Sequence, residues 1–194
     1  MNLTAELGIA LSDVILCLGT FWLGLKFRGV RGPHTWRSFF FALSTAAGVG
    51  ALYHGFSRFH EPSFWVLVSV ASMTASFLFF AACSLSGKPN WKWLTLLWPL
   101  YGLLGIITGT MLATYPFWMI TAVSLILIFL SIYVLQGNPH KECRQNIIRG
   151  LGITIIGFVA QKFISKEGFI NNNVIFHLLQ LTGNYFIWRG ANKA

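Results

Sequence analysis

Long runs of apolar residues, separated by short polar breaks, form the main pattern of this chain. Seven runs reach the length that a helix needs to cross a bilayer, which is about 20 residues. They cover residues 4–26, 37–56, 63–86, 91–114, 116–136, 145–162 and 173–189. No repeat and no shift in composition divides them into separate domains. The pattern predicts an all-α fold, a seven-transmembrane-helix bundle that forms one integral-membrane domain over residues 1–194.

Prolines, small residues and tryptophans add local detail. Pro116 suits the first turn of the fifth helix, whereas Pro99 lies inside the fourth segment and predicts a kink there. The small residues between Ser44 and Ala51 predict a face of the second helix that a neighbouring helix approaches closely. Tryptophans near the segment ends predict aromatic belts at the two membrane interfaces, with Trp36, Trp91, Trp93 and Trp188 at the inner one and Trp65 and Trp118 at the outer one.

The composition agrees with a membrane location. Only 10% of the 194 residues are charged and 55% are hydrophobic, whereas soluble domains carry about 25% charged residues. The three cysteines, Cys17, Cys83 and Cys143, are far apart and form neither a zinc-binding pattern nor a disulfide framework. The opening residues lack the positive region of a cleaved signal peptide, so the first apolar segment is expected to stay as a helix.

The basic residues predict the orientation of the bundle. The breaks after the first, third and fifth segments, together with the C-terminal tail, hold 11 Lys and Arg residues, and the alternate breaks hold three. Because basic residues favour the cytoplasmic side, we expect the N-terminus outside and the C-terminus in the cytoplasm. The net charge of +9 is then explained by topology and by anionic lipid, and it gives no reason to expect nucleic acid as a partner.

Among the ionisable residues inside the apolar segments, three stand out as functional candidates. With the predicted orientation, His54 lies roughly 3 Å and His177 roughly 6 Å below the outer ends of the second and seventh helices. Asp13 lies roughly 13 Å along the first helix from its outer start. Asn173 and Gln180 flank His177 on the seventh helix. The sequence therefore predicts a polar site in the outer half of the bundle.

Structural roles are the alternative for some of these groups. A histidine near a helix end can simply reach interfacial water. Glu6, at the outer rim, suits the positive end of the helix dipole. Asp13 differs from both, since a carboxylate this far into an apolar helix points to a cavity or to a partner.

The residues around the two histidines resemble motifs of the alkaline ceramidase and adiponectin-receptor superfamily. Those proteins are seven-helix membrane hydrolases, or relatives of them, with a zinc ion held by three histidines. Their second-helix motif is Ser-x-x-x-His, and the matching stretch here is Gly50-Ala-Leu-Tyr-His54. Their seventh-helix motif is His-x-x-x-His, and the matching stretch here is Asn173-Val-Ile-Phe-His177. The chain therefore departs from the motifs at two positions, where Gly50 replaces the serine and Asn173 replaces the first histidine.

The resemblance implies a zinc site in which His54 and His177 are ligands and a zinc-bound water attacks a lipid amide. A catalytic zinc needs three protein ligands, and a His₂-carboxylate set is an accepted arrangement. Asp13 or Glu61 would complete that set. Asp13 could instead act as a general base or hydrogen-bond to a ligating histidine. Asn173 suits a contact with water, ligand or substrate.

The sequence thus favours a multi-pass, zinc-dependent lipid amide hydrolase in which Asp13 is catalytic and Asn173 and Gln180 contact the substrate. The alternative is a non-catalytic seven-helix membrane protein in which the same polar groups bind a lipid or another small ligand. Transport is a third class, and it is less favoured because the fourth and fifth segments hold no acid or base in their interiors. Membrane lipid is the expected substrate or ligand.

Overall fold

The computed structural model describes residues 3–56, 62–87, 97–115, 117–164 and 168–193. Within these ranges the regular structure is helical and there is no strand. The helices are α1 (Leu3–Lys26), α2 (Pro33–Gly55), α3 (Pro62–Gly87), α4 (Trp98–Leu112), α5 (Phe117–Leu135), α6 (Lys141–Phe163) and α7 (Asn172–Ala191). The all-α prediction is confirmed, and each helix overlaps one apolar segment of the sequence.

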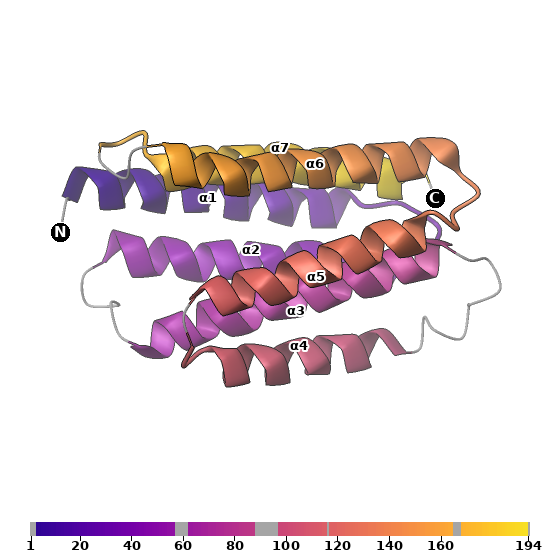
Figure 1. Cartoon of the computed structure of the whole chain (residues 1–194), viewed down its shortest axis with the longest axis horizontal. Helices are drawn as coiled ribbons and strands as arrows, with labels where there is room; N and C mark the ends of the chain where they lie inside the picture. The colour runs from indigo at the N-terminus through magenta and orange to yellow at the C-terminus, as the bar shows by residue number, and fades with distance from the viewer. Residues whose placement is uncertain (1–2, 57–61, 88–96, 116, 165–167, 194) are drawn as a thin grey trace.

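The helices lie side by side in one elongated bundle (Figure 1). α1, α3, α5 and α7 run from the end that holds the N-terminus toward the end that holds the C-terminus, and α2, α4 and α6 return. We call these two ends the N-terminal end and the C-terminal end. α7 packs against α6 and α1, α1 packs against α2, and α2 packs against α3. α4 lies at the edge of the bundle and packs almost entirely on α3.

Three helix starts differ by several residues from the sequence prediction, and one of them is that of α2, which begins at Pro33 rather than near residue 37. The expected kink at Pro99 is wrong, because α4 begins at Trp98 and Pro99 lies in its first turn, where a missing N–H breaks no helical hydrogen bond. α6 begins at Lys141 rather than near residue 145. Glu142 in its first turn favours this earlier start, since a negative charge stabilises a helix N-terminus. Pro116 lies outside the described residues, as do Trp91 and Trp93.

Glycines bring two pairs of helices into backbone contact. A Cβ added to Gly150 of α6 would collide with the carbonyl oxygen of Gly183 in α7, and one added to Gly183 would lie 2.6 Å from the Gly150 oxygen. A Cβ added to Gly105 or Gly109 of α4 would collide with the α3 backbone. Small residues of this kind let membrane helices approach closely.

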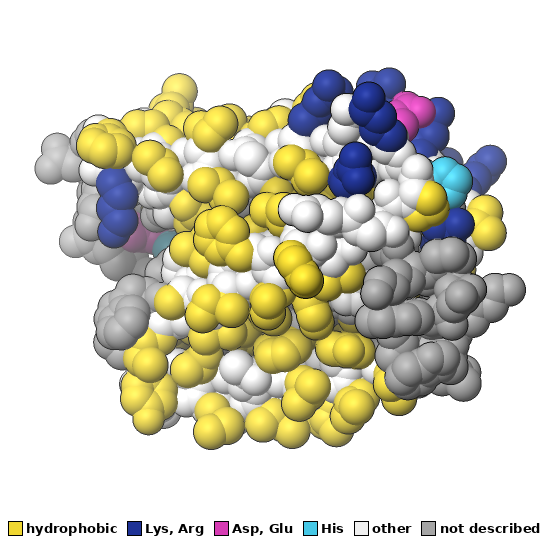
Figure 2. Space-filling view, turned by 45° about the vertical axis from the view of Figure 1, so that its right-hand side comes forward, with side chains coloured by type: hydrophobic (Ala, Val, Ile, Leu, Met, Phe, Trp, Pro, Cys, Tyr) yellow, Lys and Arg dark blue, Asp and Glu magenta, His cyan; other side chains and the backbone are white. Residues whose placement is uncertain are grey.

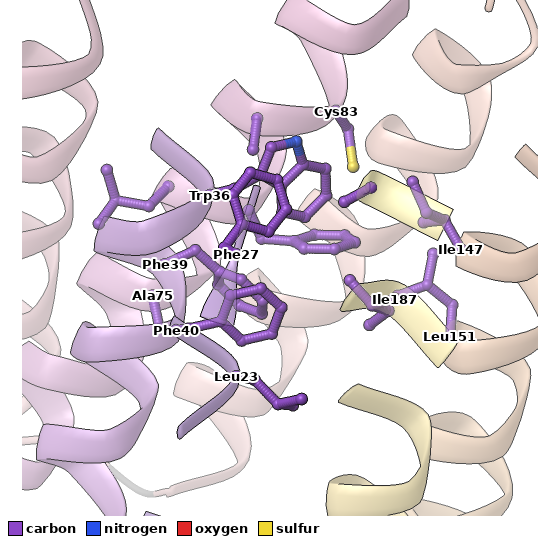
Figure 3. Close-up of a cluster of buried hydrophobic side chains, with 14 of the residues drawn as sticks. Leu23, Phe27, Trp36, Phe39, Phe40, Ala75, Cys83, Ile147, Leu151 and Ile187 are labelled. Atoms are coloured by element: carbon purple, nitrogen blue, oxygen red, sulfur yellow. The ribbon is translucent and has the colours of Figure 1, made fainter. Parts of the chain in front are cut away.

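Large apolar side chains fill the C-terminal half of the bundle (Figure 3). Trp36 is fully buried among them, and its indole N–H donates to Ser86 Oγ at 3.2 Å. We call this whole group of buried side chains, which includes Leu151 and Ile187, the aromatic cluster. Its largest members come from α2, α3 and the segment that follows α1, and they are Phe27, Trp36, Phe39, Phe40 and Phe79. The prediction that Trp36 belongs to an interfacial belt is therefore wrong, because its ring packs against these phenylalanines inside the bundle.

Apolar side chains also cover much of the outside of the bundle (Figure 2). Leu7, Leu18 and Trp22 of α1 are each about half exposed or more. In the same view Lys and Arg side chains gather toward the C-terminal end. By length and apolar composition, α1 and the Ser63–Ser86 part of α3 could each cross a membrane, and α4 and α5 contain shorter apolar stretches.

Candidate functional site

A cavity of about 500 Å³ lies between the N-terminal end and the aromatic cluster. Every helix except α4 contributes to its wall. Its volume is within the range of small-molecule sites, which is roughly 300–1,000 Å³. The cavity brings together all five site residues that the sequence singled out, namely Asp13, His54, Asn173, His177 and Gln180. Glu61, the other candidate acid, lies outside the described residues.

Ser12 and Asp13 of α1 hold the His177 ring of α7. His177 Nδ1 lies 2.9 Å from Ser12 Oγ and 3.4 Å from Asp13 Oδ1. The Ser12 hydroxyl donates its single proton to the Ile9 carbonyl at 2.8 Å, so its oxygen can only accept from the ring. His177 Nδ1 therefore carries a proton, and in the neutral ring the lone pair of Nε2 is left for a ligand.

Glu6 of α1 holds His54 of α2 in the same way. His54 Nδ1 lies 2.7 Å from Glu6 Oε2, and the two side chains are 25% and 22% exposed. An ionised carboxylate can only accept a hydrogen bond, so Nδ1 donates and Nε2 is again the nitrogen left for a ligand. Glu6 also lies in the first turn of α1, where the helix dipole favours its charge. The contact with His54 is a second role that the sequence did not indicate.

Gly50 of α2 leaves space for the Asp13 carboxylate of α1. A Cβ added to Gly50 would lie 3.0 Å from Asp13 Oδ2, so even a serine there would crowd this group. Asp13 is only 5% exposed and borders the cavity. The prediction that the small residues between Ser44 and Ala51 let a neighbouring helix approach is therefore confirmed, and that neighbour is α1.

Asparagines fix the start of α7 beside the cavity. Asn171 caps the helix, because its side chain accepts from the backbone N–H groups of Asn173 and Val174. Its amide nitrogen donates to the Ala5 carbonyl of α1 at 3.2 Å. Asn173 Oδ1 accepts a hydrogen bond from Gln161 of α6 at 3.1 Å. These contacts join α1, α6 and α7 around the polar end of the cavity.

The opposite end of the cavity is apolar. Phe39, Phe79, Leu151 and Ile187 line it and also belong to the aromatic cluster, which forms its floor. The cavity is therefore amphipathic, with polar groups near the N-terminal end and hydrocarbon toward the middle of the bundle.

The described residues do not supply a complete zinc site. The two histidines are available at Nε2, but the carboxylates of Glu6 and Asp13 lie beside the Nδ1 atoms of those same rings. No group of three His, Cys, Asp or Glu side chains within the described ranges is arranged to hold a metal. A catalytic zinc needs three protein ligands, and the described residues do not bring three together.

Three residues of the site were not identified from the sequence. Gln161 and Asn184 line the cavity and Ser12 contacts His177, but none of them belongs to a motif, and their positions follow from which helix faces meet. One signal for Asn184 was available, because it continues the spacing of Asn173 and His177 along a single face of a helix.

Comparisons with curated proteins and with solved structures find no match. A family model matches residues 9–194, a range that includes every residue lining the cavity. The chain therefore belongs to DUF6962, a family of unknown function.

Proposed function

We propose that this protein spans the membrane with seven helices and binds an uncharged lipid whose head group donates hydrogen bonds. The observation that carries the proposal is the pattern of hydrogen bonds at the polar end of the cavity. Nδ1 of His54 and of His177 is already used, so each ring leaves its Nε2 lone pair for a ligand. These two nitrogens accept, so they suit a hydroxyl or an N–H on the ligand.

The charges around the cavity favour an uncharged head group over an anionic one. None of the described residues that line the cavity is Lys or Arg. A lipid phosphate or a carboxylate buried there would have no Lys or Arg to pair with. Burying an unpaired charge is costly, so anionic lipids should bind poorly.

The surface supports the placement in a membrane. An apolar surface of this extent is unfavourable in water and marks contact with lipid or with another protein. Of the ten described Lys and Arg residues, nine lie in the C-terminal half of the bundle and only Lys162 lies near the N-terminal end. The positive-inside rule then places the C-terminus in the cytoplasm, so the cavity belongs to the outer half of the bilayer.

Binding fits the shape of the cavity better than transport does. A transporter needs a polar path toward the cytoplasmic side. Here the aromatic cluster around Trp36 lies between the cavity and the C-terminal end. The apolar floor instead suits the hydrocarbon chain of a ligand.

The test is direct binding of radiolabelled octadecan-1-ol to the full chain in detergent micelles, with palmitate as the anionic competitor. His54→Phe and His177→Phe each remove one acceptor, and loss of one hydrogen bond should weaken binding about fivefold. His140→Phe is the matched control, because His140 is exposed and does not line the cavity. The proposal would be contradicted if all three variants bound octadecan-1-ol with equal affinity. It would also be contradicted if palmitate displaced the radiolabelled probe as effectively as unlabelled octadecan-1-ol does.

A second candidate is a zinc-dependent lipid amide hydrolase. The resemblance to alkaline ceramidases favours it, and so does the pairing of each histidine with a carboxylate, since such pairs orient histidines at metal sites. Glu61 is the residue that could provide a third ligand. In that case Asp13 would orient His177 or act as a base.

Metal analysis of protein purified with added zinc tests this candidate. One zinc per chain, lost on His54→Ala or His177→Ala, would support it, and Asn173→His should then tighten zinc binding. Asp13→Asn distinguishes a zinc ligand from a general base. Loss of a ligand would release the zinc, whereas loss of a base would lower the rate of hydrolysis and leave the zinc bound. Absence of bound zinc from the unchanged protein leaves lipid binding as the function.

A further inference from the structure

A polar face of α7 continues below the histidine into the middle of the bundle. Asn173, His177, Gln180 and Asn184 all line the cavity, and their spacing places them on one side of the helix. Asn184 is the last polar residue in this row. The next α7 residue in the cavity wall is Ile187, which belongs to the aromatic cluster.

Asn184 has hydrogen-bonding capacity that the protein does not use. Its side chain is 3% exposed, and its amide nitrogen is buried without a partner among the described residues. The nearby Thr154 hydroxyl already donates its proton to the Gly150 carbonyl at 3.1 Å. Leaving an amide unsatisfied in an apolar interior is unfavourable, so such a group usually has a partner in the functional state.

Close packing explains how Asn184 is held beside the cavity. The adjacent Gly183 lies in backbone contact with Gly150 of α6, so the α7 backbone cannot shift further toward α6 at this point. A half-turn of the amide about its Cβ–Cγ bond exchanges the nitrogen and the oxygen, and either can then face the cavity. A hydroxyl or a carbonyl oxygen on a ligand would satisfy it.

We infer that the ligand carries a second oxygen-bearing group, which Asn184 binds, about 10 Å beyond its head group. Seven residues separate His177 from Asn184, and at 1.5 Å per residue this is about 10 Å along α7. An extended hydrocarbon chain covers that length in about eight or nine carbon–carbon bonds. The ligand class is therefore a lipid with a hydroxyl, keto or carbonyl oxygen in mid-chain. This inference rests on the proposed lipid-binding function.

Positional isomers of a diol test the inference without changing the overall polarity of the probe. Competition against radiolabelled octadecan-1-ol would be measured for octadecane-1,10-diol and octadecane-1,2-diol, with the full chain in detergent micelles. We expect the 1,10-diol to bind about five- to tenfold more tightly than the 1,2-diol, which corresponds to one additional hydrogen bond. Equal affinity of the two isomers for the unchanged protein would overturn the inference.

Variants assign the preference to Asn184. Asn184→Leu should lose the preference for the 1,10-diol over the 1,2-diol. Asn146→Leu is the matched control, because Asn146 is a buried asparagine of α6 that does not line the cavity. A preference that survives Asn184→Leu would contradict the inference. Failure of all three probes to bind the unchanged protein would instead refute the proposed function itself.

Discussion

The contact between α6 and α7 allows a sharp test of the packing, because two glycines of α6 differ in their surroundings. Gly150 lies against the backbone of Gly183, and an added Cβ would collide with a carbonyl oxygen that no rotamer change can move. Gly152, two residues along the same helix, has no atom within 4 Å of an added Cβ. Gly150→Ala and Gly152→Ala are therefore the same chemical change in a closed and in an open position.

The expected magnitudes follow from two opposing effects. Alanine stabilises a helix interior by about 1 kcal/mol relative to glycine, and both variants gain this. Overpacking typically costs about 1–3 kcal/mol, and only Gly150→Ala incurs it. The free energy of unfolding should therefore differ between the two variants by about 1–3 kcal/mol, with Gly152→Ala the more stable. For a chain of this length that difference corresponds to about 2–12 °C in Tm.

Thermal unfolding in detergent micelles, followed by circular dichroism, measures this difference. Because Gly150 and Gly183 lie beside the cavity wall at Thr154 and Asn184, Gly150→Ala should also weaken octadecan-1-ol binding, and Gly152→Ala should leave it unchanged. Equal Tm values for the two variants would refute the backbone contact between α6 and α7 that we describe.

Three further predictions concern other parts of the bundle. Asn171→Ala should lower the free energy of unfolding by about 1–2 kcal/mol through loss of the α7 cap, and Asn171→Ser, which keeps an uncharged acceptor for the cap, should lower it less. Ser86→Ala should cost about 1–3 kcal/mol because it leaves the Trp36 indole N–H unpaired, whereas Ser84→Ala should cost less, since Ser84 only bonds to a carbonyl of its own helix. Both effects would be read from Tm, and similar losses in the paired variants would contradict them. An epitope tag after residue 194 should be labelled by antibody only in permeabilised cells, and labelling of intact cells would reverse the predicted orientation.

The number and order of helices could be predicted because apolar length is a property of each segment by itself. Helix ends and side-chain environments were harder to predict, since they depend on neighbours. Pro99 falls within an apolar run, and nothing in that run indicates that the helix begins at Trp98. Trp36 has the position of a belt residue along its helix, but it faces the phenylalanines of the bundle interior rather than lipid.

In the candidate site, too, the residues that stand out by type could be predicted, and the contacts between them could not. His54, His177 and Asp13 stand out because ionisable groups in apolar segments are rare, and they line one cavity. Their hydrogen-bond partners could not be predicted, because nothing distinguishes Glu6 and Ser12 from other residues of α1 until the rotation of α1 against α2 and α7 is known. Gly50 indicated a close helix approach, but the sequence did not show that the approaching group is a carboxylate.

The seam between α1 and α7 has a consequence for biosynthesis. Hydrogen bonds connect the two helices near both ends of this seam. At one end Asn171 donates to the Ala5 carbonyl, and at the other the Arg28 backbone N–H donates to Asn192 Oδ1 at 2.7 Å. A ribosome that adds about 5–20 residues per second completes α7 on the order of ten seconds after α1. Throughout that interval Asp13 lacks His177, and the cavity lacks one wall. A transcript truncated before α7 would thus encode α1 to α6 and most of the apolar surface, but neither His177 nor the α7 wall of the cavity.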